Sequence, residues 1–245
     1  MTMSDTTPRR LYLLQLSTAL IPTAGQPLAA SSGCYLIQMS DGRNILIDSG
    51  LPPDYSSPPG LPPAHHHKNV LEHLSDLGLR PEQIDLLICS HFDVDHAGYH
   101  DAFPYAECVV QRSHYELARA GHPRYAAARV HWDHPALRYR LIDGDIELLP
   151  GLSLIETSGH APGHQSVVVR LPETGPVLLA IDAVVMQRLF TPERRAWPTD
   201  DNEEQLQAST RKLLKLVERE QVALVVFGHD GEQWQTLKKA PTYYA

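Results

Sequence analysis

Short apolar runs bounded by turn residues recur along the whole chain, and they constrain its fold more than any other feature. Their length and their content of Val, Ile and Leu are typical of strands. Asp41–Gly42 and Asp143–Gly144 each stand between two consecutive runs and predict hairpin turns. The predicted strands cover residues 11–16, 34–39, 44–50, 84–89, 107–111, 138–142, 145–149, 152–157, 166–171, 176–181 and 223–227.

Helical segments are predicted between some of these strands. One follows residue 69 and ends at Gly78, a second covers about 113–120, and the longest covers 203–220, where leucines lie along one face. A chain of 245 residues suits one large domain or two small ones. Because no repeat, linker or composition break divides it, we predict a single α/β domain over residues 1–245, mixing hairpins with crossover helices.

A long loop is predicted before the first helix. Residues 51–67 are rich in Pro, Ser and His, and long ordered loops of this kind often act as lids. His65, His66 and His67 end the segment. Adjacent side chains diverge, so we interpret these histidines as lid or surface residues, with lining of a site's mouth as the alternative.

Charge and composition restrict the partners. The net charge of −8 argues against binding to nucleic acid or to an anionic membrane. No stretch approaches the roughly 20 apolar residues of a membrane span, and the N-terminus lacks the apolar core of a signal peptide. The three cysteines have no CxxC spacing, which favours a reduced, cytoplasmic protein. A small-molecule partner is expected, and a homodimer is left open.

Four polar clusters each follow a predicted strand: "HFDVDH" at 91–96, "SGHAPGH" at 158–164, "IDA" at 181–183 and "GHD" at 228–230. One such cluster alone would be a solvated surface pair or a helix cap, and Asp95 suits a cap. Four clusters at strand ends are harder to explain in that way, because strand ends carry the functional loops of a sheet. The candidate ligands are His91, Asp93, Asp95, His96, His160, Asp182 and His229.

These side chains have the chemistry of a metal site, since neutral imidazole and carboxylate bind zinc and similar divalent ions. His91 and Asp93 are two residues apart in an extended turn, so they point the same way and suit one ion. Asp95 and His96 diverge from them and suit a second. Seven ligands are enough for two ions if one carboxylate bridges.

The motifs resemble those of the metallo-β-lactamase superfamily. "SHFDVDHAG" (90–98) is similar to its metal-binding signature HxHxDH, and "ILIDSG" (45–50), "TSGHAPGHQS" (157–166), "LLAIDA" (178–183) and "FGHD" (227–230) match its other motifs in order. "VVQRSHYELA", "IDGDIELLPGLSL" and "VFGHDGEQW" resemble the bacterial N-acyl homoserine lactone lactonases. The resemblance covers roughly residues 30 to 240. It implies a four-layer αβ/βα sandwich with the metals in a cleft at one edge.

The resemblance also implies how the site works. A hydroxide that bridges two divalent ions would attack an ester or lactone carbonyl, and Asp95 would be both a ligand and a proton shuttle. Asp48 would support a ligand histidine, and His164 would orient its loop. The implied ligand sets are His91, Asp93 and His160 for the first ion, Asp95, His96 and His229 for the second, and Asp182 as the bridge.

Two positions depart from the family pattern. Asp93 stands where most members have a histidine. It adds negative charge, which favours iron or manganese over the expected zinc, and we interpret it as a retained ligand, against loss of the first ion. Val185 stands where the lactonases have a tyrosine that holds the substrate carbonyl. Tyr35, Tyr55 and Tyr99 are the conceivable substitutes.

The leading functional hypothesis is therefore a dinuclear metal-dependent hydrolase that opens N-acyl homoserine lactones, which are quorum signals, or a related lactone. Three alternatives are kept: a thioesterase or esterase similar to glyoxalase II, a diiron oxidoreductase, and a relative without catalytic activity.

Overall fold

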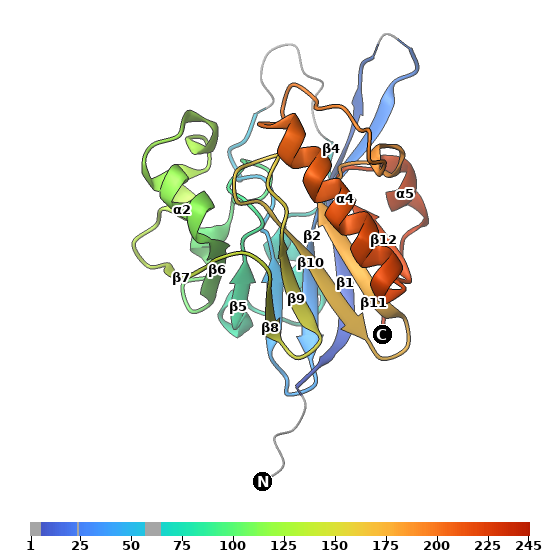
Figure 1. The fold of residues 1–245 in the computed structure, drawn as a ribbon. Helices are drawn as coiled ribbons and strands as arrows, with labels where there is room; N and C mark the ends of the chain where they lie inside the picture. Colours follow the sequence, from blue (N-terminus) through green and yellow to red (C-terminus); the bar gives the residue numbers. More distant parts are fainter. Residues whose placement is uncertain (1–5, 24, 57–64) are drawn as a thin grey trace.

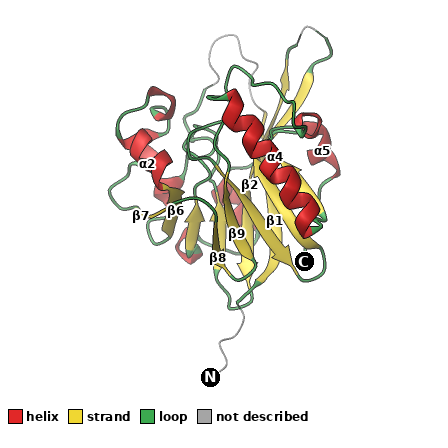
Figure 2. Cartoon of the chain, in the orientation of Figure 1, coloured by secondary structure: helices red, strands yellow, loops and turns green. Residues whose placement is uncertain are grey.

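The computed structural model describes residues 6–23, 25–56 and 65–245. Two β-sheets pack face to face, and helices lie on their outer faces (Figure 1, Figure 2). This arrangement confirms the predicted four-layer sandwich. No helix in the described ranges is long and apolar enough to cross a membrane.

The first sheet has seven strands in the order β4-β1-β2-β3-β5-β6-β7. Its first four strands pair antiparallel, whereas β3, β5, β6 and β7 run parallel to one another. The bounds are β1 Pro8–Ile21, β2 Leu28–Met39, β3 Asn44–Ile47, β4 His65–His66, β5 Leu86–Ile88, β6 Glu107–Gln111 and β7 Arg138–Ile142.

The second sheet has five strands in the order β12-β11-β10-β9-β8. Strands β8 to β11 form an antiparallel meander, and β12 joins β11 in parallel. The carboxyl ends of β9, β11 and β12 therefore lie at one edge. The bounds are β8 Ile146–Leu149, β9 Leu152–Glu156, β10 Gln165–Leu171, β11 Gly175–Ile181 and β12 Leu224–Phe227.

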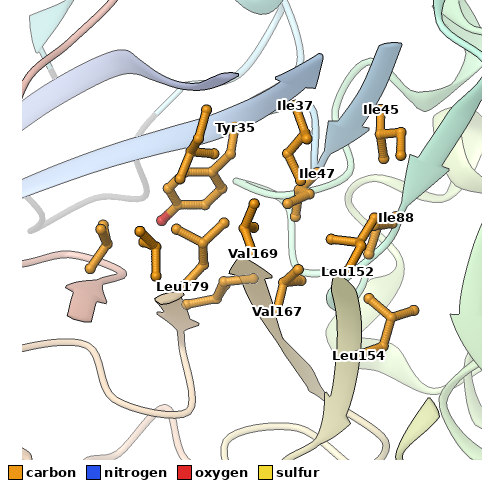
Figure 3. Close-up of a cluster of buried hydrophobic side chains, with 14 of the residues drawn as sticks. Tyr35, Ile37, Ile45, Ile47, Ile88, Leu152, Leu154, Val167, Val169 and Leu179 are labelled. Carbon is orange, nitrogen blue, oxygen red and sulfur yellow. The ribbon is translucent and has the colours of Figure 1, made fainter. Parts of the chain in front are cut away.

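The main core lies between the two sheets. Strand side chains alternate between faces, so Tyr35 and Ile37 of β2 point inward while Cys34 and Leu36 point outward. Figure 3 shows the inward side chains of both sheets meeting. The labelled residues are Tyr35, Ile37, Ile45, Ile47 and Ile88 from the first sheet and Leu152, Leu154, Val167, Val169 and Leu179 from the second.

Helices cover both outer faces. α1 (Val70–Asp76), α2 (Arg112–Arg119) and α3 (Arg129–Trp132) contribute to the apolar cluster on the first sheet. α4 (Glu203–Glu220) places Leu213 and Leu216 on the outer face of the second sheet and lies across it in Figure 1. α5 (Gly231–Thr236) follows β12. The 3-10 turns are η1 Pro81–Gln83, η2 His100–Ala102, η3 Pro123–Tyr125 and η4 Gln187–Leu189.

One predicted hairpin is wrong. Asp143–Gly144 does form a turn, with Gly144 at a φ of 70°, but the strands on either side belong to different sheets. β7 pairs in parallel with β6, whereas β8 pairs with β9. The amide side chain of Gln111 holds the turn through both backbone groups of Gly144, which directs the chain across to the second sheet.

The predicted lid is described only in part, because residues 57–64 lie outside the described ranges. His65 and His66 form the short strand β4, which pairs with Thr18 and Ser17 of β1. The interpretation of these two histidines as surface residues agrees with their exposure.

Candidate metal centre

All seven predicted ligand residues lie together at one edge of the sandwich. β5 leads into the segment with His91, Asp93, Asp95 and His96, and β9, β11 and β12 lead to the other three residues. Because β9, β11 and β12 point the same way, their following loops meet at the same edge. Convergence of the four polar clusters, which spacing alone could not establish, is thus a feature of the structure.

The first group consists of His91, Asp93 and His160, whose ligand atoms lie within 4.8 Å of one another. Oδ2 of Asp93 is 3.3 Å from Nε2 of His91 and 3.3 Å from Nε2 of His160. All three side chains are largely buried, and that of Asp93 is 17% exposed.

The second group consists of Asp95, His96 and His229. Oδ2 of Asp95 lies 3.7 Å from Nε2 of His96 and 3.6 Å from Nε2 of His229. The carboxylate of Asp95 is more open than that of Asp93, with 30% of its side chain exposed.

Asp182 lies between the groups and contacts both. Its Oδ2 is 3.3 Å from Nε2 of His160 in the first group. Its Oδ1 is 3.6 Å from Nε2 of His96 and 3.1 Å from Nε2 of His229 in the second. Gly228 keeps this position open, because a Cβ there would lie 2.6 Å from Oδ1 of Asp182.

Each of the four histidines uses Nδ1 for an outer partner and directs Nε2 inward. His96 donates from Nδ1 to Asp48 at 2.9 Å, as predicted for Asp48, and His160 donates to Asp200 at 2.9 Å. His91 donates to the hydroxyl of Ser90 at 2.9 Å, and His229 to the carbonyl of Ser31 at 3.0 Å. Such partners fix both the tautomer and the orientation of a metal ligand.

The backbone is strained at two of the strand ends. Asp48 has a φ of 59° and Ile181 a φ of 51°, although a β-branched residue rarely adopts the left-handed region. Ile181 directly precedes Asp182, and Asp48 follows β3. Strain of this kind persists where the surroundings impose it, and it is concentrated at functional sites.

Burial and charge determine the protonation of the centre. Burial lowers the pKa of His91 to about 3, so its ring is neutral at neutral pH. Burial alone would also lower the pKa of His160, but the carboxylates of Asp182, Asp200 and Asp93 raise it to about 9. Nη2 of Arg124 lies 2.8 Å from Nε2 of His160 and can only donate. A pKa of about 9 would put a proton on Nε2 at neutral pH, but that proton would point at the Nη2 donor 2.8 Å away, so in this arrangement His160 is neutral and accepts at Nε2.

The donor set fits divalent cations. Nε2 of His91, Nε2 of His96 and Oδ1 of Asp182 are buried and have no hydrogen-bond partner among the residues that the structure describes. Buried polar atoms without partners are costly, whereas cations held by the first group, the second group and Asp182 would satisfy all three.

The sequence model of the metallo-beta-lactamase superfamily matches residues 30–229. The chain belongs to the metallo-beta-lactamase superfamily. Within it, an N-acyl homoserine lactonase from Bacillus sp is 34% identical, and the match covers 90% of each chain. An N-acyl homoserine lactonase from Bacillus thuringiensis is 31% identical, and the match covers 97% of this chain and 99% of the relative.

Solved structures of metallo-beta-lactamase fold lactonases agree with the fold. The crystal structure of a quorum-quenching N-acyl homoserine lactone lactonase has a TM-score of 0.86 at 31% identity, covering 98% of this chain and 100% of the other. An N-acyl homoserine lactone hydrolase with the product N-hexanoyl-L-homoserine bound at its catalytic metal centre has a TM-score of 0.85 at 29% identity. The match covers 97% of this chain and 100% of the other.

Two histidines that are not candidate ligands hold the backbone segments that carry the ligands of this superfamily member. His164, which was expected to orient its loop, accepts from the backbone N–H of Asp182 at 3.2 Å. His114, to which the sequence assigns no role, accepts from the N–H of Phe92 at 2.9 Å and donates to the carbonyl of Pro162 at 2.7 Å. It therefore ties together the two loops that carry the first group.

Sequence reasoning also missed Arg124 and Asp200. Asp200 holds His160, and Arg124 contacts both Asp93 and His160. Neither residue lies in a motif, and both are distant in sequence from their partners. The unusual aspartate at position 93 was the only sequence signal of a cationic partner nearby.

Tyr55 is the candidate among the three tyrosines whose pKa is affected by a residue of the second group, Asp95. It is half-buried and lines a cavity of about 310 Å³ together with Ser49 and Tyr99. Burial and the charge of Asp95 raise its pKa. Tyr35, in contrast, is buried between the sheets.

Proposed function

We propose that this protein is a dinuclear metal-dependent hydrolase that opens lactone rings, and that N-acyl homoserine lactones are its substrates. The observation that carries the proposal is the position of Asp182, which contacts His160 of one group and His96 and His229 of the other. The names of the relatives support the substrate class.

In this proposal, the first group holds one ion, the second group holds another, and Asp182 binds both. Divalent ions there supply a water of lowered pKa and a Lewis acid for the substrate carbonyl. Zinc suits the histidine-rich donor set, while the extra carboxylate of Asp93 favours iron or manganese.

Asp95 is the group that we assign to proton transfer. Opening a lactone breaks the bond between the carbonyl carbon and the ring oxygen, and the leaving alkoxide needs a proton. The side chain of Asp95 is 30% exposed, against 17% for Asp93 and 6% for Asp182. It is therefore the carboxylate of the centre that a bound substrate can reach most easily.

Tyr55 is the group that we assign to the substrate carbonyl. Val185, three residues after Asp182, has no hydrogen-bond donor. The Tyr55 hydroxyl is protonated at neutral pH, and burial and the charge of Asp95 raise its pKa further, so it can donate to the carbonyl oxygen.

One experiment tests the proposal: metal analysis of protein purified without added metal, paired with assays on lactones and on glutathione thioesters. We expect bound metal and lactone hydrolysis in the wild type and in Asp93→His. Fewer than one metal per chain together with no hydrolysis of any lactone or ester would overturn the proposal. Hydrolysis of the thioesters alone would replace the lactonase with a thioesterase.

A further inference from the structure

Arg124 binds the unusual aspartate of the first group with both arms of its guanidinium. Nε donates to Oδ1 of Asp93 at 2.7 Å, and Nη2 donates to Oδ2 at 2.6 Å. The Arg124 side chain is 20% exposed and that of Asp93 is 17% exposed, so the pair is mostly shielded from water. A two-pronged contact of this kind is the strongest form of an arginine–carboxylate pair.

The same guanidinium also contacts His160. Nη1 donates to the His160 carbonyl at 2.7 Å, and Nη2 lies 2.8 Å from Nε2 of the ring. Nε2 of a neutral imidazole has a single lone pair. It can accept a hydrogen bond from Arg124 or coordinate a metal ion, but it cannot do both at once.

The turn that carries Arg124 is firmly held. The side chain of His122 accepts from the backbone N–H of Arg124 at 3.4 Å. Tyr125 is fully buried, its ring packs edge-on against His114 at 4.7 Å, and its carbonyl accepts from Trp132 at 3.0 Å. These contacts hold the guanidinium of Arg124 beside the first group.

The second group has no such partner. Asp95 forms ion pairs only with His96 and His229 among the residues that the structure describes. An arginine, which always carries its charge, therefore pairs with the carboxylate of the first group, whereas the carboxylate of Asp95 has only histidine partners. The charges of Asp93 and Arg124 cancel. The pair therefore has the same net charge, zero, as the neutral histidine that most family members have at position 93.

We propose that Arg124 is a built-in cation of the first group that competes with a metal ion for Oδ2 of Asp93 and Nε2 of His160. The two groups then fill unequally. An ion binds first to the group of Asp95, His96 and His229, and the first group accepts an ion only when the guanidinium moves away. This inference rests on the proposed ligand sets but not on the substrate.

The test is a titration of metal-free protein with Zn²⁺, followed by calorimetry and by metal analysis after dialysis. We expect one tightly bound and one weakly bound ion in the wild type. In Arg124→Gln, the weaker ion should bind roughly 10- to 100-fold more tightly, the range over which partners of ligands tune affinity. Arg43→Gln is the matched control, because Arg43 pairs with Asp41 at 2.7 Å beside the start of β3, away from the centre.

A second variant keeps the inference testable if Arg124→Gln alone does not fold. Arg124→Gln leaves Asp93 without its cation, so the double variant Asp93→His with Arg124→Gln is titrated in parallel, and it should also bind both ions tightly. Equal affinities in the wild type that Arg124→Gln leaves unchanged would overturn the inference. Loss of the weaker ion in both variants would also overturn it, because Arg124 would then support the first site.

The titration contains no substrate, so its outcome is separate from that of the hydrolase proposal. A protein that binds the two ions unequally but opens no lactone keeps this inference and contradicts the proposed function.

Discussion

The two ligand groups share Asp182 but differ in what surrounds them. The first group is closed over by Arg124 and His114, and its carboxylate is paired and mostly buried. The second group faces outward through Asp95, whose only ion-pair partners in the described ranges are two histidines. One edge of a sandwich can therefore hold two similar donor sets that differ in the charge of the side chains around them. Such sets should bind ions with different affinity.

The largest effect is expected at Asp182, because both groups share this residue. Asp182→Asn should weaken both ions, because both groups lose the same negative oxygen. We expect kcat/KM for a lactone to fall by about 10³-fold or more, at least the usual cost of removing one transition-state contact. Asp41→Asn, at the hairpin turn, is the control. Loss of only one ion would mean that Asp182 does not serve both groups.

The next largest effects should separate the groups. Asp48→Asn disturbs His96, and Asp200→Asn disturbs His160, through the Nδ1 contacts at 2.9 Å. Each change should weaken one ion by roughly 10- to 100-fold. In zinc titrations, Asp48→Asn should affect the tighter ion and Asp200→Asn the weaker one. Asp48 also accepts from Ser90, the partner of His91, so the decisive result is the tighter ion: if Asp48→Asn leaves its affinity unchanged, His96 does not bind that ion.

Acid should loosen the first group through His114. Burial lowers the pKa of His114 to about 4 in the folded protein, below its usual 6.5, so the unfolded chain takes up the proton first. The stability that His114 contributes is complete above pH 6.5 and is lost as the pH falls towards 4. Between pH 7 and pH 5 this loss is about 2 kcal/mol.

The measurement is the free energy of unfolding of metal-free protein at both pH values. Gln at position 114 can both accept and donate but does not titrate. His114→Gln should therefore show a smaller loss than the wild type between pH 7 and pH 5. An identical loss in both proteins would show that protonation of His114 does not cause the loss of stability.

The smallest effect is expected at Tyr55. Tyr55→Phe removes the hydroxyl assigned to the substrate carbonyl, and kcat/KM for a lactone should fall roughly tenfold, the value of one hydrogen bond to a polarised group. Tyr99→Phe, which lines the same cavity, is the control. Equal rates for Tyr55→Phe and the wild type would show that another group replaces the tyrosine missing at position 185.

Much of this structure could be predicted from local patterns. Strands β6 and β7 and helix α4 lie where apolar spacing placed them, because β6 is buried along most of its length, β7 alternates in exposure and α4 buries one face. The wrong hairpin at Asp143–Gly144 has a clear reason. A turn signal reports the local bend, whereas the pairing of β8 depends on β9 and on the contact with Gln111.

The same distinction applies to the site. The seven candidate ligands were visible because each follows a strand and matches a motif. Arg124, His114 and Asp200 were not, because a contact such as Arg124 with Asp93 joins residues 31 positions apart on unrelated elements. Single-sequence patterns carry no information about such pairs.

The most direct test of the central claim follows ring opening of N-hexanoyl-L-homoserine lactone while Zn²⁺ is added stepwise to metal-free protein. We expect no activity without metal, little at one equivalent, and full activity as the second, weaker ion binds. Full activity without metal would contradict the claim, as would the absence of ring opening with two ions bound.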